Sequence, residues 1–280
     1  QINKVFYFDT TDSSGWIQVE LLGLVDRYYK SQLLVDRERY LEPMYGYRPF
    51  SDYFHRKFGV EDANPQYSEP VGDHALLDRL AVSWNSGLAD YSVYGLSRMG
   101  LYMRFPWKGL LRFPSDFTPV RKKRYVDVQA RMGISYPRES VSWQRKKLIQ
   151  ILEKHVDTRK LSRRQFFSEL KQSKIVVSPF GFGEITLKDF EVFLTGGLLL
   201  KPSMASIETW PSLFRDNETM VSHAWDLSDL EDKLAMVLEH YDDYIEIAER
   251  GQNEYRLHME RASGSKLFAD HFESIVKQAF

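Results

Sequence analysis

The chain has 280 residues, of which 43% are hydrophobic and 28% charged, and its formal net charge is -1. This composition is typical of a globular protein with one large or two ordinary domains. A net charge this small gives no overall electrostatic attraction to nucleic acid or to an anionic membrane, so we expect no nucleic-acid partner. The sequence contains no cysteine. Disulfides, Cys-ligated zinc, iron–sulfur clusters and thiol catalysis are therefore excluded, and we expect a cytoplasmic protein.

No apolar run is long enough to cross a bilayer, so no integral membrane segment is expected. In the first part of the chain, Val5–Phe8 predicts a strand and the pattern around Trp16–Tyr29 predicts a helix. Further helices are expected near His74–Trp84 and Ala89–Met103. The stretch Phe105–Arg124, with three prolines and a basic run, is interpreted as a solvated connection between two domains.

From Tyr125 onward, predicted strands alternate with predicted helices. Strands are expected at 125–130, 174–177, 198–200 and 219–222, and helices at 139–155, 162–170, 186–195, 228–248 and 266–279. Capping boxes at Ser162, Thr186 and Ser228 mark three of the helix starts. This alternation is the signature of an α/β fold with a parallel sheet. Ligands bind at the carboxyl ends of such strands, so the loops after Phe8, Ala130, Val177 and Leu200 are the candidate site.

The loop after Val177, SPFGFGE, is the most informative of these loops. Gly181 and Gly183 let the backbone approach a ligand closely, and the helix that starts at Thr186 offers free N–H groups to a phosphate. No G-x-G-x-x-G and no P-loop motif occurs, which argues against a dinucleotide or P-loop site. Two carboxylates follow, Glu184 and Glu191, and either is suited to accept bonds from ribose hydroxyls. The alternative, that acids in a first helical turn complement the helix dipole, is favoured for Asp189.

The segment SKIVVSPFGFGEITLKDFEVFLTGGLLLKP resembles the donor-binding segment of GT-B glycosyltransferases, and it is most similar to the exostosin-like group. The matching positions are Ser178, Pro179, Gly181, Lys188, Phe190, Glu191 and Gly197. The resemblance covers about Tyr125 to Arg256. Glu184 lies one residue closer to Glu191 than in the E-x7-E pattern of retaining group-1 enzymes, which argues against a retaining mechanism.

The resemblance implies two Rossmann-like domains that face one another across a cleft. Their expected bounds are 1–118 for an acceptor-side domain and 119–262 for the donor domain, with 263–280 as a C-terminal helix that crosses back to the first domain. Donor binding is assigned to Arg131, Arg138, Ser178, Pro179, Phe180, Gly181, Gly183, Glu184, Lys188, Glu191 and Thr209. Arg131 follows a strand, and arginine gives bidentate contacts to phosphate oxygens. Thr209 belongs to a loop that either closes over the donor or lies on the surface.

Asp12, followed by Asp9, is the candidate general base, because the loop FDTTDSSG would face the cleft. The alternative is an Asx-type turn, in which these acids bond only to local N–H groups. No D-x-D motif occurs, so no metal site and no cofactor are expected. Five aromatic residues are interpreted mainly as core, with an acceptor groove as the alternative: Trp84, Tyr91, Tyr94, Tyr102 and Trp107.

The predicted function is transfer of a sugar from a nucleotide donor, in particular a UDP-sugar, to a glycan hydroxyl, with inversion and without a metal. The alternative is a non-catalytic nucleotide- or glycan-binding protein on the same fold.

Overall fold

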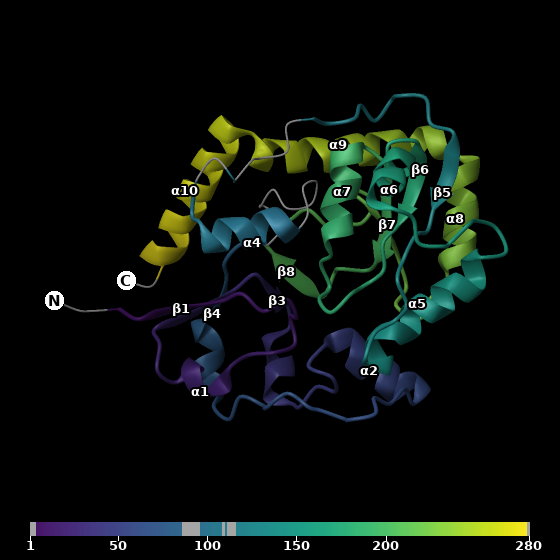
Figure 1. The fold of residues 1–280 in the computed structure, drawn as a ribbon. Coiled ribbons are helices and arrows are strands. Elements are labelled where there is room, and N and C mark those ends of the chain that lie inside the picture. The colour runs from purple at the N-terminus through teal and green to yellow at the C-terminus, as the bar shows by residue number, and fades with distance from the viewer. Residues whose placement is uncertain (1–3, 86–95, 108–109, 111–115, 279–280) are drawn as a thin grey trace.

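The structure is a computed structural model that describes residues 4–85, 96–107, 110 and 116–278 (Figure 1). Its strands are β1 Phe6–Asp9, β2 Arg27–Lys30, β3 Gln32–Leu34, β4 Leu80–Val82, β5 Val126–Gln129, β6 Ser173–Val177, β7 Leu198–Pro202, β8 Ile207–Thr209 and β9 Val221–His223. Its α-helices are α1 Val19–Leu22, α2 Pro49–Phe58, α4 Leu96–Arg104, α5 Glu139–Leu152, α6 Arg163–Leu170, α7 Leu187–Thr195, α8 Leu230–Glu239, α9 Tyr241–Met259 and α10 Arg261–Lys277. Short 3₁₀ helices cover Arg37–Leu41 and His74–Arg79.

The first unit contains a parallel sheet of order β1-β2-β4. The expected helix over Trp16–Tyr29 is wrong, because only α1 is helical and the chain then enters β2. Tyr28 and Tyr29 are fully buried in that strand, where aromatic side chains are favoured. The expected helix near His74–Trp84 is also replaced, by a 3₁₀ helix followed by β4. Of the helix expected at Ala89–Met103, residues 89–95 lie outside the described residues.

The second unit contains a parallel sheet of order β5-β6-β7-β9. Its central strands are buried on both faces, because Ile175 and Val177 belong to one core cluster and Val176 to the other. The expected cap of α7 at Thr186 is confirmed, and that helix ends at Gly196, whose φ of 69° favours glycine. The capping box predicted at Ser228 does not form. Asp229 precedes α8, and the long helix expected there is divided at His240 into α8 and α9.

The two units pack directly against one another. β3 of the first unit pairs antiparallel with β8 of the second, with Gln32 opposite Thr209. Beside this pair, the rings of Phe50 on α2 and Phe180 after β6 lie 4.9 Å apart between centroids. One core cluster therefore contains side chains from both units. The expected α/β fold, with two units that each hold a parallel sheet, is confirmed.

The last helix lies against the first unit. Figure 1 shows α9 along the second unit and α10 turning towards β1. The Tyr29 hydroxyl donates to the carbonyl of Ile275 at 2.5 Å, and the Trp84 and Phe268 rings lie 5.1 Å apart between centroids. Among the described residues, no helix combines the length and apolar character needed to span a membrane.

We expect Phe50→Ala to lower the free energy of unfolding by about 3–5 kcal/mol, because it opens a cavity in the core shared by both units. Urea unfolding followed by circular dichroism measures the change. Phe105→Ala is the matched control, because the Phe105 ring is exposed, and its effect should stay within about 0.5 kcal/mol. Equal effects of the two substitutions would show that the shared core does not stabilise the protein.

Candidate functional site

Two loops meet where the carboxyl ends of the two sheets face each other. One is residues 10–15 after β1, and the other is residues 178–186 between β6 and α7. The amide and hydroxyl of Ser14 donate to the two carboxylate oxygens of Glu184, at 3.0 and 2.9 Å. A Cβ atom on Gly183 would lie 2.0 Å from the carbonyl oxygen of Asp12. Glycine is therefore required at Gly183 by the contact with another segment of this chain.

A cavity of about 190 Å³ lies beside this contact. It is lined by Phe8, Asp9, Thr10, Asp12, Ser31, Gln32, Ser83, Trp84, Asn85 and Ile185. Most of these residues follow the carboxyl ends of β1, β2 and β4, where a parallel sheet binds its ligands. Ile185 comes from the facing loop and stands two residues before α7. The cavity therefore lies between the two units, at the carboxyl edge of the sheet where a ligand site was expected.

Two of the lining side chains carry a buried amide oxygen without a hydrogen-bond partner, those of Gln32 and Asn85. Their orientation is fixed, because the amide nitrogen of Gln32 donates to the carbonyl of Asp12, and that of Asn85 donates to the carbonyl of Pro211 at 3.1 Å. An unpaired buried acceptor costs about 1–3 kcal/mol. A ligand hydroxyl that reaches these oxygens would remove that cost.

Asp9 and Asp12, the two candidate bases from the sequence, differ in how many hydrogen bonds their carboxylate oxygens accept. Asp9 accepts bonds from the Tyr28 hydroxyl at 2.6 Å, the Lys30 ammonium at 3.0 Å and the Thr11 amide at 2.8 Å. Burial opposes ionisation, but Lys30 and these bonds together hold the pKa of Asp9 below its usual value. Asp12 is exposed and lines the cavity. Among the described residues, no group donates a hydrogen bond to its carboxylate, which leaves Asp12 free to act on a ligand.

The predicted donor loop is held from beneath by a buried ion pair. The Asp189 carboxylate lies 2.9 Å from the Lys201 ammonium, and both side chains are fully buried. Asp189 also accepts from the Ser178 hydroxyl at 2.6 Å and from the Thr186 amide at 2.8 Å. Burial lowers the pKa of Lys201, and the charge of Asp189 opposes that effect. Ser178 and Asp189 therefore fix the loop that begins at Pro179.

Several cations surround this loop. Arg145 donates to the carbonyls of Phe180 at 2.7 Å and Gly133 at 3.1 Å, with its guanidinium also close to Gly181. Arg48, which the sequence did not single out, donates to the carbonyl of Phe182. Both arginines are buried, and burial lowers the pKa of each.

Two predicted phosphate ligands already have protein partners. The guanidinium of Arg131 binds both carboxylate oxygens of Glu169, at 2.9 and 2.7 Å, and lies 2.9 Å from Asp157. Arg138 donates to the carbonyl of Gly46 at 3.3 Å and to Gln66 at 2.5 Å. Arg48 and Arg145, by contrast, donate to carbonyls of the loop itself.

Lys188 and Glu191 lie on successive turns of α7. The Lys188 ammonium donates to the carbonyls of Arg131 and Val177, each at 2.8 Å, at the carboxyl edge of the sheet. Burial, together with the charge of Arg145, lowers the pKa of Lys188 to about 7. Burial also raises the pKa of Glu191 to about 7, against the opposing charges of Arg163 and Lys188. Both groups therefore change charge near neutral pH.

Thr209 ends β8 and donates to the carbonyl of Pro211 at 3.2 Å. Thr209 does not line the cavity itself, whereas Gln32, which lies opposite it in the strand pair, does. The aromatic candidates are divided, because Trp84 lines the cavity whereas Trp107 is exposed and not part of the core. Tyr91 and Tyr94 lie outside the described residues. No group of three or more His, Cys, Asp or Glu side chains is placed to hold a metal ion within the part of the chain that the structure describes.

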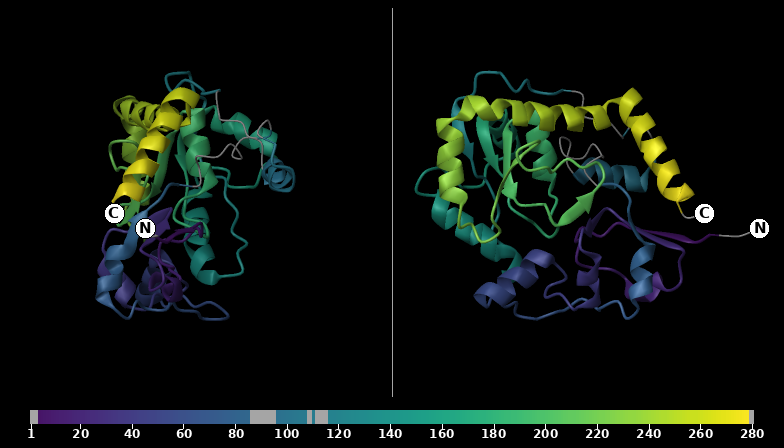
Figure 2. Two further views of the ribbon diagram at one scale, coloured as in Figure 1. Left: turned by 90° about the vertical axis from the view of Figure 1, so that its left-hand side faces the viewer. Right: turned by 180° about the vertical axis from the view of Figure 1, so that it is seen from behind.

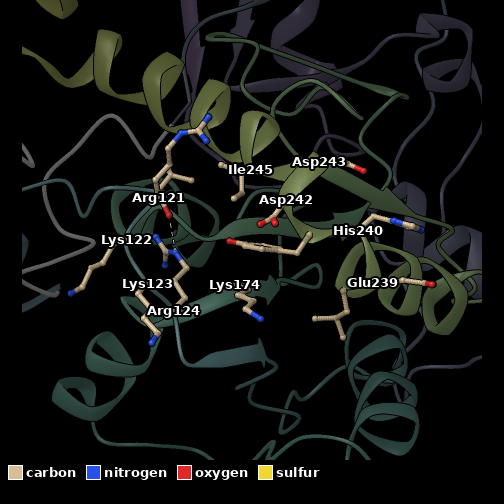
Figure 3. Close-up of a pocket in the computed structure, with 13 residues that line it drawn as sticks. Arg121, Lys122, Lys123, Arg124, Lys174, Glu239, His240, Asp242, Asp243 and Ile245 are labelled. Atoms are coloured by element: carbon tan, nitrogen blue, oxygen red, sulfur yellow. Dashed lines mark hydrogen bonds between the residues drawn. The ribbon is translucent and has the colours of Figure 1, made fainter.

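A larger cavity of about 600 Å³ lies at the opposite edge of the second sheet, beside the amino ends of β5 and β6 (Figure 3). The run Arg121–Arg124 lines it, and this run is more than a solvated connection. Arg124 is buried and donates to the carbonyls of Ser173 and Thr195, each at 2.9 Å, while Arg121 binds Glu249. Because parallel sheets bind ligands at their carboxyl ends, this cavity is not the candidate site.

No protein-family model matches the sequence, and no curated protein matches it. Among solved structures, the chain is similar to the crystal structure of TarM, with 7% sequence identity and a TM-score of 0.47. The match covers 95% of this chain and 50% of the TarM chain, so this chain spans half the length of that protein. What this chain does must therefore be inferred from the geometry of its own site.

We expect Gly183→Ala to destabilise the protein by about 1–3 kcal/mol or more, because the new methyl group overlaps the Asp12 backbone. Thermal unfolding compares it with Gly72→Ala, where the added Cβ meets nothing within 4 Å. If both variants unfold at the wild-type temperature, the two loops are not in contact.

Glu191→Gln should change how stability depends on pH. The pKa of Glu191 rises from 4.5 unfolded to about 7 folded, so the folded state holds the extra proton between these values. The free energy of unfolding of the wild type should then fall, relative to the variant, by up to about 3 kcal/mol as pH rises through this window. Urea unfolding at pH 4.5 and 8 tests this. Parallel pH profiles of the two proteins would contradict it.

Proposed function

We propose that this chain is a glycosyltransferase that moves a sugar from a nucleotide donor, in particular a UDP-sugar, to a hydroxyl of a glycan, with inversion and without a metal. The observation that carries the proposal is the cavity between the facing units. It combines one free carboxylate, two unpaired amide oxygens and the rings of Phe8 and Trp84. Aromatic faces and hydrogen-bond acceptors together suit a sugar ring, whose hydroxyls donate around an apolar face.

In the proposed reaction Asp12 is the general base. It takes the proton from the acceptor hydroxyl while the acceptor oxygen forms a bond to the anomeric carbon of the donor sugar. The bond from that carbon to the phosphate oxygen breaks, and the nucleoside diphosphate leaves with the electron pair. Direct displacement of this kind inverts the configuration. Asp9 acts as a positioning residue, because its oxygens are bound by Tyr28, Lys30 and Thr11.

The leaving diphosphate is assigned to the amino-terminal end of α7. That helix begins two residues after Ile185, which lines the cavity, and a helix N-terminus stabilises an anion. Arg48 and Arg145 add positive charge around the loop and fix its carbonyls. Glu191 is assigned to the ribose hydroxyls, as the resemblance implies. Arg131 is left out of this assignment, because Glu169 and Asp157 engage its guanidinium.

Asp12→Asn tests the base. We expect the variant to keep its thermal stabilisation by nucleoside diphosphate and to lose about 10²–10⁴-fold in transfer rate. Ligand at about 100 times its Kd stabilises the wild type by roughly 2.7 kcal/mol, a readable shift. Asp78→Asn is the matched control, because Asp78 is exposed and does not line the cavity.

The outcomes separate the proposal from its alternative. If no nucleoside diphosphate or nucleotide sugar stabilises the wild type, the donor site is wrong. If nucleotides bind but the wild type neither transfers sugar nor hydrolyses the donor, the chain is a non-catalytic binding protein. If Asp12→Asn and Asp78→Asn both retain full activity, Asp12 is not the base.

A further inference from the structure

Large apolar side chains lie exposed on α4 and on the turn that follows it. The exposed fractions are 51% for Leu101, 78% for Met103, 59% for Phe105 and 70% for Trp107. None of the four belongs to either core cluster. Single exposed apolar residues are common on protein surfaces, but here four large apolar side chains are exposed within seven positions, and concentrations of this kind mark interaction sites. We call these four residues, with Arg104, the α4 patch.

The backbone of the α4 patch is ordered in continuous turns. The Phe105 amide donates to the Leu101 carbonyl at 2.7 Å, which continues the helical turn, and the Trp107 amide donates to the Phe105 carbonyl at 2.6 Å. The Arg104 guanidinium lies 5.7 Å from the centre of the Phe105 ring. Figure 2 shows α4 projecting from the body of the molecule in the left-hand view. The patch is therefore presented outward, with its apolar groups and a cation side by side.

The sequence around the patch is basic. Between Asp90 and Asp116 there is no aspartate or glutamate, whereas the cations are Arg98, Arg104, Lys108 and Arg112. The chain as a whole has a net charge of -1, so this concentration of positive charge is local. An acidic surface is the electrostatic complement of such a segment.

We propose that the α4 patch binds the surface of a bilayer that contains anionic lipid. Trp and Phe side chains are favoured at the level of the lipid headgroups, where an apolar face enters the acyl boundary. Arg104 is attracted to anionic headgroups. The helix lies in the interface and does not cross the bilayer. This binding does not depend on the proposed transferase activity and can be tested without a substrate.

Co-sedimentation with vesicles tests the proposal, using phosphatidylcholine alone and phosphatidylcholine mixed with phosphatidylglycerol. The wild type should bind the mixed vesicles more strongly, and its binding should weaken as salt is raised. The double variant Phe105→Ser/Trp107→Ser should lower the partition coefficient about tenfold or more. Arg104→Glu should reduce the preference for the anionic vesicles.

The matched control is Leu24→Ser/Tyr125→Ser, which replaces two side chains of comparable exposure, 74% and 69%, outside the patch. It should bind vesicles as the wild type does. Thermal unfolding of every variant checks that the fold is kept, which is expected because the replaced side chains are exposed.

Three results would overturn the proposal. The first is a wild type that does not sediment with either kind of vesicle, and the second is a double variant that binds as well as the wild type. The third is a wild-type dimer in sedimentation velocity that the double variant loses while vesicle binding is absent, which would show that a second copy of the chain covers the patch.

Discussion

The carboxylate of Glu184 is the point on which the arrangement of the two units depends. It is fully buried, and burial raises its pKa. A buried carboxylate costs several kcal/mol unless it is paired or hydrogen-bonded. Here the amide and hydroxyl of Ser14 compensate it from the opposite unit. Asp12 stands two residues before Ser14, and Ile185 directly follows Glu184, so the same bonds fix the two sides of the cavity against each other.

A second constraint is repeated in each unit, where a lysine at the end of a strand is paired with a buried aspartate. Lys30 in β2 pairs with Asp9 at 3.0 Å, and Lys201 in β7 pairs with Asp189 at 2.9 Å. Each pair lies beneath one of the two facing loops and holds it by further hydrogen bonds. Both loops are therefore held in place by the protein's own contacts. Asp12 differs from Asp9 and Asp189 in having a free carboxylate.

The second unit was largely predictable from the sequence, because its central strands β6 and β7 contain apolar runs and α6 and α7 begin with capping boxes. The strand Ser173–Val177 and the cap at Thr186 lie where the pattern placed them. In the first unit the strand expected at Val5–Phe8 is found as β1, but β2, β3 and β4, which have three or four residues each, were not predicted. RYYK was absorbed into a predicted helix, since four residues show too little alternation to reveal a strand.

The candidate site followed the same division. The sequence singled out Asp12 and the glycine loop as candidates, but it did not single out Gln32, Asn85 or Arg48. Gln32 and Asn85 follow short strands that the pattern did not reveal, and recognising those strands would have drawn attention to the residues just after them. Arg48 gives no comparable signal, because its contact with Phe182 joins positions 134 residues apart in the chain. Side chains that come into contact only because two units pack together produce no recognisable pattern in the local sequence.

The pairing of β3 with β8 limits how the molecule can move. A hinge between two lobes normally needs a boundary that few bonds cross, whereas here backbone hydrogen bonds join the lobes across that boundary. Gln32 belongs to this ladder and also lines the cavity. Any rocking of one lobe against the other therefore displaces a cavity wall directly. A molecule that enters or leaves the cavity either distorts this two-stranded bridge or passes through motion of the loops alone.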